Sequence, residues 1–458
     1  MLSIHKLLLT ASIMLLSVST CHAQDGFSRT ATEIINDMSP GWNLGNTMEA
    51  TTSWTGGALW NNGGGLGAET GWQGTKTTPE LIAFVKSLGF KSVRIPCAWA
   101  FGHISDASSY KIDAAWMARV KEIVDYCINE GLYVVLNDHW DGGWLEEHIK
   151  DTNPTTIQNN KYILQVLWTQ IAETFKDYDD HLLFAGLNEP NADTQSATNN
   201  LIVYNQAFVD AVRATGGNNT YRVLVVQGPS TNIDHTCNFM SNKMPTDVTS
   251  DKLAVEVHYY NPWQFWGMEK DESWGKVFYY WGSGNHYSGS QHNATWGEES
   301  EMRSQLQKMK TNFVDKGYPV VIGEFGANWR DLSSLSNESQ DKHNQSIKSH
   351  YRELFRLTKE MGGMVPMVWD TNSPNQNGTK GTMTIIDRSR KTVYGVYAME
   401  GINEIYPRPS EDGIRASSLP SSMESSNDLY NLQGMRISHA TTPSKGIYVQ
   451  AGHKYVVR

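Results

Sequence analysis

Amphipathic helical segments alternate with short apolar runs along most of the chain, and this alternation constrains the fold more than any other feature. One helical segment has Thr78 as N-cap, Pro79 in its first turn and Gly89 as its left-handed end, and two more end at Gly131 and Gly216. Short, nearly continuous apolar runs are typical of parallel strands that are buried on both faces. Such runs occupy residues 41–44, 93–96, 132–136, 182–187, 223–226, 253–257, 320–322 and 364–369. Their order predicts an α/β fold, a (β/α)8 TIM barrel, with a doubly wound open sheet as the alternative.

Polar residues stand at the ends of these apolar runs. They are Asn46, Arg94, Asn137 with His139, Asn188 with Glu189, His258 with Tyr260, Glu324 and Trp369. One or two of them could be helix caps, but capping alone does not explain so regular a pattern. Because the active sites of such barrels lie at the carboxyl ends of the strands, the pattern predicts a catalytic site there.

Two of these strand-end residues, Glu189 and Glu324, are carboxylates. Glycoside hydrolysis uses two carboxyl groups, although either residue alone also fits a structural ion pair. The chain contains 16 Trp and 20 Tyr, and flat apolar rings suit stacking on sugars, while core packing accounts for many of them. The long aromatic loop over residues 261–297 is expected to shape a binding cleft at the barrel mouth.

Six short motifs occur at the strand ends in a fixed order. They are Gly-Trp-Asn-Leu-Gly-Asn-Thr at 41–47, Val-Arg-Ile-Pro at 93–96, Leu-Asn-Glu-Pro at 187–190, Val-Glu-Val-His-Tyr-Tyr at 255–260, Gly-Glu-Phe-Gly at 323–326 and Val-Trp-Asp at 368–370. Each is weak alone, but together the chain resembles glycoside hydrolase family 5, the cellulase family A enzymes, over nearly all of residues 30–405. The resemblance implies the family's barrel and its retaining chemistry.

By this resemblance Glu189 corresponds to the general acid/base and Glu324 to the nucleophile. Asn188 would hold the 2-hydroxyl of the attacked sugar. Arg94 would lie beside Glu324 and favour its ionised form, and Tyr260 would donate a hydrogen bond to it.

Five further side chains are expected to bind substrate or to support the site. His258 would lie near the acid/base, His139 would bind sugar hydroxyls, Trp369 would form a platform beneath the sugar, and Asn46 belongs to the first motif. Trp140 stands where many family members have a second His, and it offers a stacking surface.

The resemblance also sets expectations for the chemistry. Like-charge repulsion from Glu324 should raise the pKa of Glu189, and the two carboxyl groups should lie about 5–5.5 Å apart, as retention requires, rather than about 9 Å. The expected substrate is the β-1,4-linked glucan backbone of cellulose-type polysaccharides, with xyloglucan, mixed-linkage glucan and β-mannan as alternatives. No metal ion or organic cofactor is expected.

The N-terminus resembles an export signal. Lys6 precedes an apolar run over residues 7–18, and small residues precede Gln24, so residues 1–23 are predicted to be a signal peptide. The run is short for a transmembrane helix. Secretion is therefore expected, with the periplasm or cell-surface attachment through a lipidated Cys21 as alternatives. The net charge of −10 argues against nucleic-acid binding.

The composition divides the rest of the chain into three parts. Residues 24–406 are expected to form the catalytic barrel, residues 407–428 a linker rich in Ser, Pro and acidic residues, and residues 429–458 a small β-rich tail. The tail resembles the C-terminal sorting segments of secreted Bacteroidetes proteins, and a small β module is an equal alternative. We expect a monomer.

Two other functions remain open. A carbohydrate-binding barrel without turnover would keep the aromatic cleft, and a metal-dependent barrel hydrolase would use His139, His258 and Glu324.

Overall fold

The computed structural model describes residues 26–52, 64–376 and 378–408, together with the backbone of four short strands between residues 429 and 457. The predicted signal peptide, residues 53–63 and nearly all of the predicted linker lie outside the described residues. The chain divides into two units, Met1–Arg408 and Pro409–Arg458, and each is described by itself.

The first unit is built on eight parallel strands that close into a barrel in the order β1-β10-β9-β8-β7-β6-β5-β2. The strands are β1 (Gly41–Asn43), β2 (Ser92–Ile95), β5 (Tyr133–Asn137), β6 (Leu182–Ala185), β7 (Leu224–Gln227), β8 (Leu253–Tyr259), β9 (Val320–Phe325) and β10 (Met364–Val368). Each of the predicted apolar runs contributes one of them. The (β/α)8 prediction is confirmed, and the open sheet is wrong because β1 pairs with both β2 and β10.

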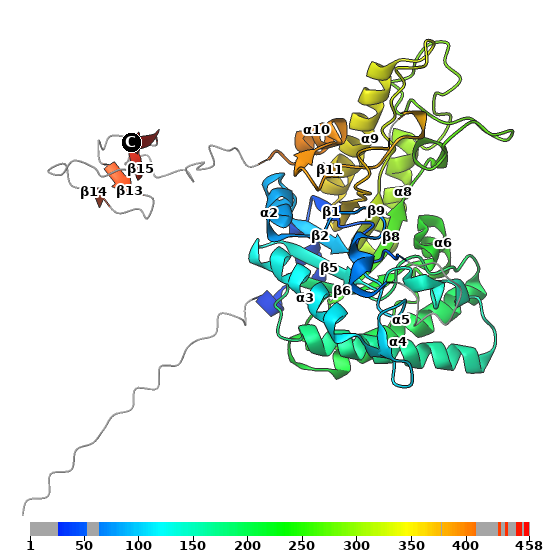
Figure 1. The fold of residues 1–458 in the computed structure, drawn as a ribbon. Helices are drawn as coiled ribbons and strands as arrows, with labels where there is room; N and C mark the ends of the chain where they lie inside the picture. The colour runs from blue at the N-terminus through cyan, green and yellow to red at the C-terminus, as the bar shows by residue number, and fades with distance from the viewer. Residues whose placement is uncertain are drawn as a thin grey trace, which may run out of the picture. The chain divides into compact units, whose positions relative to one another are not determined.

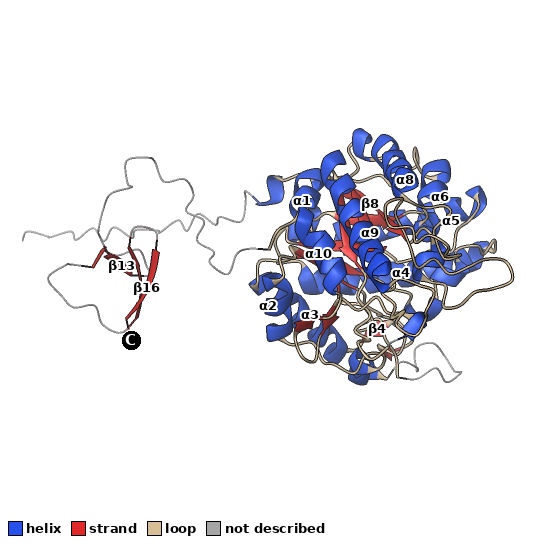
Figure 2. Cartoon of the chain, turned by 90° about the horizontal axis from the view of Figure 1, so that it is seen from above, coloured by secondary structure: helices blue, strands red, loops and turns tan. Residues whose placement is uncertain are grey.

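Helices surround the barrel (Figures 1 and 2). They are α1 (Ala31–Asp37), α2 (Pro79–Ser87), α3 (Ala114–Asn129), α4 (Pro154–Phe175), α5 (Gln195–Ala214), α6 (Ile233–Phe239), α7 (Trp263–Trp266), α8 (Glu299–Asn312), α9 (Gln340–Met361) and α10 (Val396–Ile405). The predicted capping of α2 is present, because Thr78 accepts a hydrogen bond from the Leu81 amide and Gly89 has a φ of 95°.

Shorter elements fill the connections. Two hairpins are formed by β3 (Ile104–Asp106) with β4 (Lys111–Ile112) and by β11 (Ile386–Asp387) with β12 (Thr392–Val393). Turns of 3-10 helix are η2 (Gly26–Ser28), η4 (Gly65–Thr70), η5 (Asp141–Gly143), η6 (Glu146–His148), η7 (Gly217–Thr220), η8 (Pro229–Thr231), η9 (Val314–Lys316) and η10 (Gly378–Lys380).

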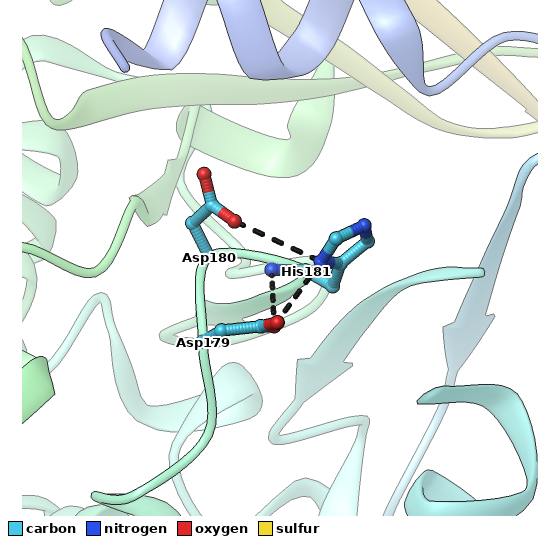
Figure 3. Close-up of side chains that lie close together, drawn as sticks. All are labelled: Asp179, Asp180 and His181. Carbon is cyan, nitrogen blue, oxygen red and sulfur yellow. Dashed lines mark hydrogen bonds and ion pairs between the residues drawn. The ribbon is translucent and has the colours of Figure 1, made fainter. Parts of the chain in front are cut away.

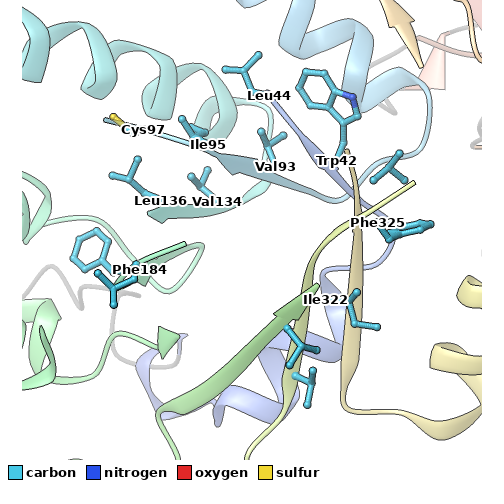
Figure 4. Packing of buried hydrophobic residues seen from close by; sticks show 14 of the residues in the cluster. Trp42, Leu44, Val93, Ile95, Cys97, Val134, Leu136, Phe184, Ile322 and Phe325 are labelled. Atoms are coloured by element: carbon cyan, nitrogen blue, oxygen red, sulfur yellow. The ribbon is translucent and has the colours of Figure 1, made fainter. Parts of the chain in front are cut away.

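Side chains alternate between the two faces of each barrel strand, and this alternation places the polar residues. Val93 and Ile95 of β2 belong to the main hydrophobic core, whose packing is seen in Figure 4, so Arg94 between them points into the barrel. Val255 and Val257 of β8 likewise leave Glu256 inside. A second cluster joins inward residues of six strands with α1, which covers the amino-terminal end of the barrel. Its members include Ile34, Ile35, Val135, Leu183, Val225, Ala254, Val321 and Val365.

A bulge sits where β9 meets its neighbours. Val257 of β8 pairs with Ile322, but His258 pairs with Glu324, so Gly323 is the additional residue on β9. A Cβ on Gly323 would lie 1.9 Å from an oxygen of Glu256, so only glycine fits there. Bulges next to active sites re-aim side chains, and this one brings Glu324 opposite His258.

The aromatic loop over residues 261–297 differs in part from the expectation. Tyr279 and Tyr280 pack with Met268, Val277 and Leu332 in a small core of their own, which is a structural role. Other aromatic side chains of the loop are exposed, with Trp263 at 46% and Trp274 at 65%.

The second unit contains an antiparallel sheet in the order β14-β13-β15-β16. Its strands are β13 (Leu429–Asn431), β14 (Arg436–Ile437), β15 (Gly446–Gln450) and β16 (His453–Val457). Among the described residues of the whole chain, no helix has the length and apolar character needed to cross a membrane.

Candidate active site

Glu324, near the carboxyl end of β9, is enclosed by hydrogen-bond donors. Its Oε1 accepts from Arg94 Nη1 at 3.0 Å, its Oε2 accepts from the Tyr260 hydroxyl at 3.1 Å, and its side chain is only 8% exposed. Burial raises the pKa of Glu324, and the charges of His258 and Arg94 offset this only in part. Burial and the charge of Glu324 raise the pKa of Tyr260 far above its ordinary value, so Tyr260 remains a donor.

Arg94 is fully buried beneath the site and organises it. Besides Glu324, its guanidinium donates to Asn188 Oδ1 at 2.8 Å and to Asn43 Oδ1 at 3.1 Å, and its Nε lies 2.9 Å from Glu256 Oε1. One cation therefore neutralises two carboxylates and fixes two amides. The guanidinium is suited to this because its donors lie in one rigid plane.

Glu189 follows β6 and faces the opening of the barrel. Its side chain is 48% exposed, and its Oε1 lies 2.7 Å from His258 Nδ1. An oxygen of Glu189 and an oxygen of Glu324 lie within 4.8 Å of each other. Glu189, which follows β6, and Glu324, near the end of β9, are thus adjacent. Glu189 is open to solvent, and Glu324 is enclosed.

The charges and hydrogen bonds of this cluster favour the protonated form of His258. Burial lowers the pKa of His258, but the charge of Glu324 and the hydrogen bond to Glu189 outweigh it and raise the pKa to about 10. Burial raises the pKa of Glu189, yet the hydrogen bond and charge of His258 dominate and the net direction is down. The expectation of a raised pKa for Glu189 is therefore wrong for the unliganded protein, because an imidazolium next to the carboxylate favours its ionised form.

Three polar residues of the site were missed by the sequence analysis. Glu256 is fully buried and bonds Gln227 Nε2 at 2.7 Å, with His258 Nε2 at 3.4 Å. The sequence did offer a sign of Glu256, because it is a charged residue inside an apolar strand, two positions before His258. Asn43 orients Arg94 and also donates to the Gly323 carbonyl at 2.8 Å.

The third missed residue is Glu146, in the loop after β5. Its Oε1 accepts the backbone N–H of Glu189 at 2.5 Å, and its own carbonyl accepts from Asn191 at 3.0 Å. No motif or strand end pointed to it. Burial raises the pKa of Glu146 to about 7, the hydrogen bond from Glu189 opposes this, and the charge of Glu189 adds to it.

The predicted sugar-facing residues have different neighbours. His139 and Trp369 are stacked, with ring centroids 5.7 Å apart and planes 13° apart, and burial and the charge of Arg94 keep the pKa of His139 far below its ordinary value. Trp140 packs against Phe101 and Trp72, at centroid distances of 5.5 and 6.4 Å.

Asn46 has a role between loops. Its Nδ2 donates to the Thr371 carbonyl at 3.3 Å, and its backbone N–H is bonded by Glu49. It ties the loop after β1 to the loop after β10.

Within the part of the chain that the structure describes, two groups of side chains have spacings that suit a metal ion. One is the carboxylate pair with His258, where Arg94 and the charged imidazole already supply positive charge; His139, required by the metal-dependent alternative, is not in the group. The other is Asp179, Asp180 and His181 before β6, shown in Figure 3. There Asp179 accepts from the His181 amide at 3.0 Å, as in an ordinary turn.

Comparison with known proteins gives one family. Residues 49–375 match the model of the cellulases, glycosyl hydrolase family 5. Endoglucanase A of Paenibacillus barcinonensis is 37% identical over 379 residues, which cover 78% of this chain and 86% of the relative. A xyloglucan-specific endo-beta-1,4-glucanase of Bacteroides ovatus is 37% identical over 340 residues, covering 73% of this chain and 63% of the relative.

A solved structure resembles the chain closely. It is a xyloglucan-specific beta-1,4-glucanase from a ruminal metagenomic library, in complex with the oligosaccharide XXLG. The TM-score is 0.74 at 49% identity, and the match covers 82% of this chain and 96% of the other.

Proposed function

The chain belongs to glycosyl hydrolase family 5 and is a glycoside hydrolase, and from this premise we propose that it is a retaining endo-β-1,4-glucanase. Glu189 is the general acid/base and Glu324 the nucleophile. The observation that carries the proposal is the adjacency of the two carboxylates within 4.8 Å, with Arg94 and Tyr260 bonded to one and His258 to the other. That spacing is far from the roughly 9 Å that inversion needs for an intervening water.

The first half-reaction follows from the contacts. Glu324, held by Arg94 and Tyr260, attacks the anomeric carbon and forms a glycosyl ester. The proton shared by His258 and Glu189 passes through Glu189 to the departing oxygen, because Glu189 is the exposed member of that pair. General acid catalysis of this kind contributes about a hundredfold to ten-thousandfold.

The second half-reaction returns the proton. Esterification removes the charge of Glu324, which is among the influences that raise the pKa of His258. The pair of His258 and Glu189 then takes a proton from water as it attacks the ester, and the sugar leaves with its configuration retained.

The test is reducing-sugar release from carboxymethylcellulose, mixed-linkage β-glucan, xyloglucan and β-mannan by the wild type and by Glu324→Gln. We expect wild-type activity on β-1,4-glucans and a loss of at least about a thousandfold in the variant, because the nucleophile is removed. Tight binding without any product would favour a non-catalytic carbohydrate-binding barrel. Loss of activity in EDTA would favour the metal-dependent alternative.

Xyloglucan is a specific second candidate for the preferred substrate. The relatives named above include two xyloglucan-specific enzymes, one of them 49% identical to this chain. A kcat/KM on xyloglucan at least ten times that on carboxymethylcellulose would assign this specificity, and equal values would assign a broad endoglucanase.

We also propose export by the N-terminal segment, with a mature chain that begins at Gln24 and acts as a monomer. N-terminal sequencing of the protein from the culture medium tests the cleavage site. Recovery in the membrane fraction with a lipid on Cys21 would favour cell-surface attachment instead.

A further inference from the structure

Glu146 lies at the point where two active-site loops meet. The loop after β5 is anchored by the buried Asp141, which accepts the Phe101 amide at 2.6 Å and Trp144 Nε1 at 3.1 Å. The polypeptide then continues through the buried Leu145 to Glu146, so the position of Glu146 is fixed from one side.

From the other side Glu146 holds the loop after β6. Its carboxylate accepts the backbone N–H of Glu189 at 2.5 Å and a hydrogen bond from the Asn188 side chain, and its carbonyl accepts the amide of Asn191. The side chain of Glu189 is half-exposed and is hydrogen-bonded to His258. The direction of the acid/base side chain therefore depends on how firmly its backbone is held.

A carboxylate is an unfavourable choice for this purpose alone. The carboxyl groups of Glu189 and Glu324 act on Glu146 through their charge, and Asp138 is a third acidic group that interacts with it. A glutamine would accept the same N–H without the repulsion and without the cost of partly desolvating a charge. A charged residue at a position where the neutral glutamine would be more favourable indicates that the charge has a functional role.

We propose that Glu146 is a positioning residue for Glu189: its carboxylate fixes the backbone of the acid/base residue, and its negative charge helps the pair of Glu189 and His258 to keep the proton that the leaving group receives. The inference rests on the proposed role of Glu189. It adds a third carboxylate to a reaction that formally needs two.

The charge has a definite sign of effect. When Glu146 is ionised, it disfavours loss of the proton from the neighbouring pair, so the alkaline limb of kcat/KM lies at higher pH than it would otherwise. Because the pKa of Glu146 is about 7, Glu146 is ionised in the pH range of the alkaline limb, and its charge acts on the pair there. Removing the charge should move the alkaline limb to lower pH.

The experiment compares Glu146→Gln, Glu146→Ala and the exposed neighbour Glu147→Gln in the full chain. Two substrates are used, phenyl β-cellobioside, whose leaving group needs a proton, and 2,4-dinitrophenyl β-cellobioside, whose leaving group does not. Glu146→Ala should lose about tenfold to a hundredfold in kcat/KM on the phenyl glycoside and less than about threefold on the dinitrophenyl glycoside.

Glu146→Gln keeps the acceptor and tests the charge. Its alkaline limb should lie about half a unit to one unit below that of the wild type, while Glu147→Gln should match the wild type. Equal losses on both substrates in Glu146→Ala, or a wild-type alkaline limb in Glu146→Gln, would overturn the proposal. Wild-type turnover of the dinitrophenyl glycoside that Glu324→Gln abolishes shows separately that the proposed function holds.

Discussion

Replacement of Arg94 by Met removes the cation on which the site is built. Arg94 is fully buried, and it contacts Glu256 at 2.9 Å and Glu324 at 3.0 Å, two carboxylates with 0% and 8% side-chain exposure. Methionine fills much of the same space but leaves both carboxylates without their shared partner. Breaking a buried ion pair from one side costs about 3–5 kcal/mol, and with two carboxylates affected we expect the upper half of that range at pH 7.

The loss should depend on pH. Burial raises the pKa of Glu256, but the charge of Arg94, the hydrogen bond and charge of His258 and the hydrogen bond from Gln227 together outweigh it, so the pKa is lowered in the folded protein. Such a group stabilises the fold above its unfolded pKa of about 4.3, and the contribution disappears as the pH falls through the folded pKa. The variant lacks this contribution, so the difference between the two proteins should be largest at neutral pH and should shrink in acid.

Urea unfolding followed by tryptophan fluorescence, at pH 7 and at about pH 3, below the ordinary carboxyl pKa, measures both quantities. Arg303→Met is the matched control, because Arg303 pairs with Glu360 at 2.9 Å on the surface, with exposures of 45% and 48%, and should lose less than about 1 kcal/mol. A loss below about 1 kcal/mol for Arg94→Met, or the same loss at both pH values, would refute the reasoning.

Three further changes probe the neighbouring residues. Tyr260→Phe removes the hydroxyl that donates to Glu324 at 3.1 Å. Because hydrogen bonds to charged groups contribute about 1.5–3 kcal/mol, kcat/KM on β-glucan should fall about tenfold to a hundredfold. An unchanged value would contradict the assigned contact. His258→Gln should move the alkaline limb of kcat/KM to lower pH. The reason is that the pKa of His258, about 10, sets the pH at which His258 and Glu189 together lose their shared proton. An alkaline limb at the wild-type position would exclude this role of His258. Gly323→Ala places a methyl group 1.9 Å from Glu256 Oε1 and should destabilise the barrel by about 1–3 kcal/mol, so a melting curve identical to that of the wild type would show that the bulge tolerates a side chain.

The barrel could be predicted from sequence because its signals are local. Each strand is a short apolar run between helices, and each run needs only its own residues to be identified. The carboxylate pair was also within reach, since both residues follow such runs and all strands of a parallel barrel end at the same rim.

The supporting residues depend on contacts between distant segments, which explains why the sequence analysis missed them. Glu146 meets Glu189 across 43 positions of the chain, and nothing near Glu146 in the sequence announces that contact. Asn46 and Trp140 were predicted to bind substrate or to support the site, and the structure adds contacts that no motif announced: Asn46 bonds the loop after β10, and Trp140 packs against Phe101. The direction of the pKa shift of Glu189 was mispredicted because it depends on the 2.7 Å contact with His258. That contact is formed only in the folded chain.

The most direct test of the central claim is to identify the residue that becomes glycosylated. A 2-deoxy-2-fluoro β-cellobioside with a good leaving group should trap the ester, and mass spectrometry of the digested protein locates the label. We expect one label per chain, on Glu324. A label on Glu189, Glu146 or any other residue would contradict it.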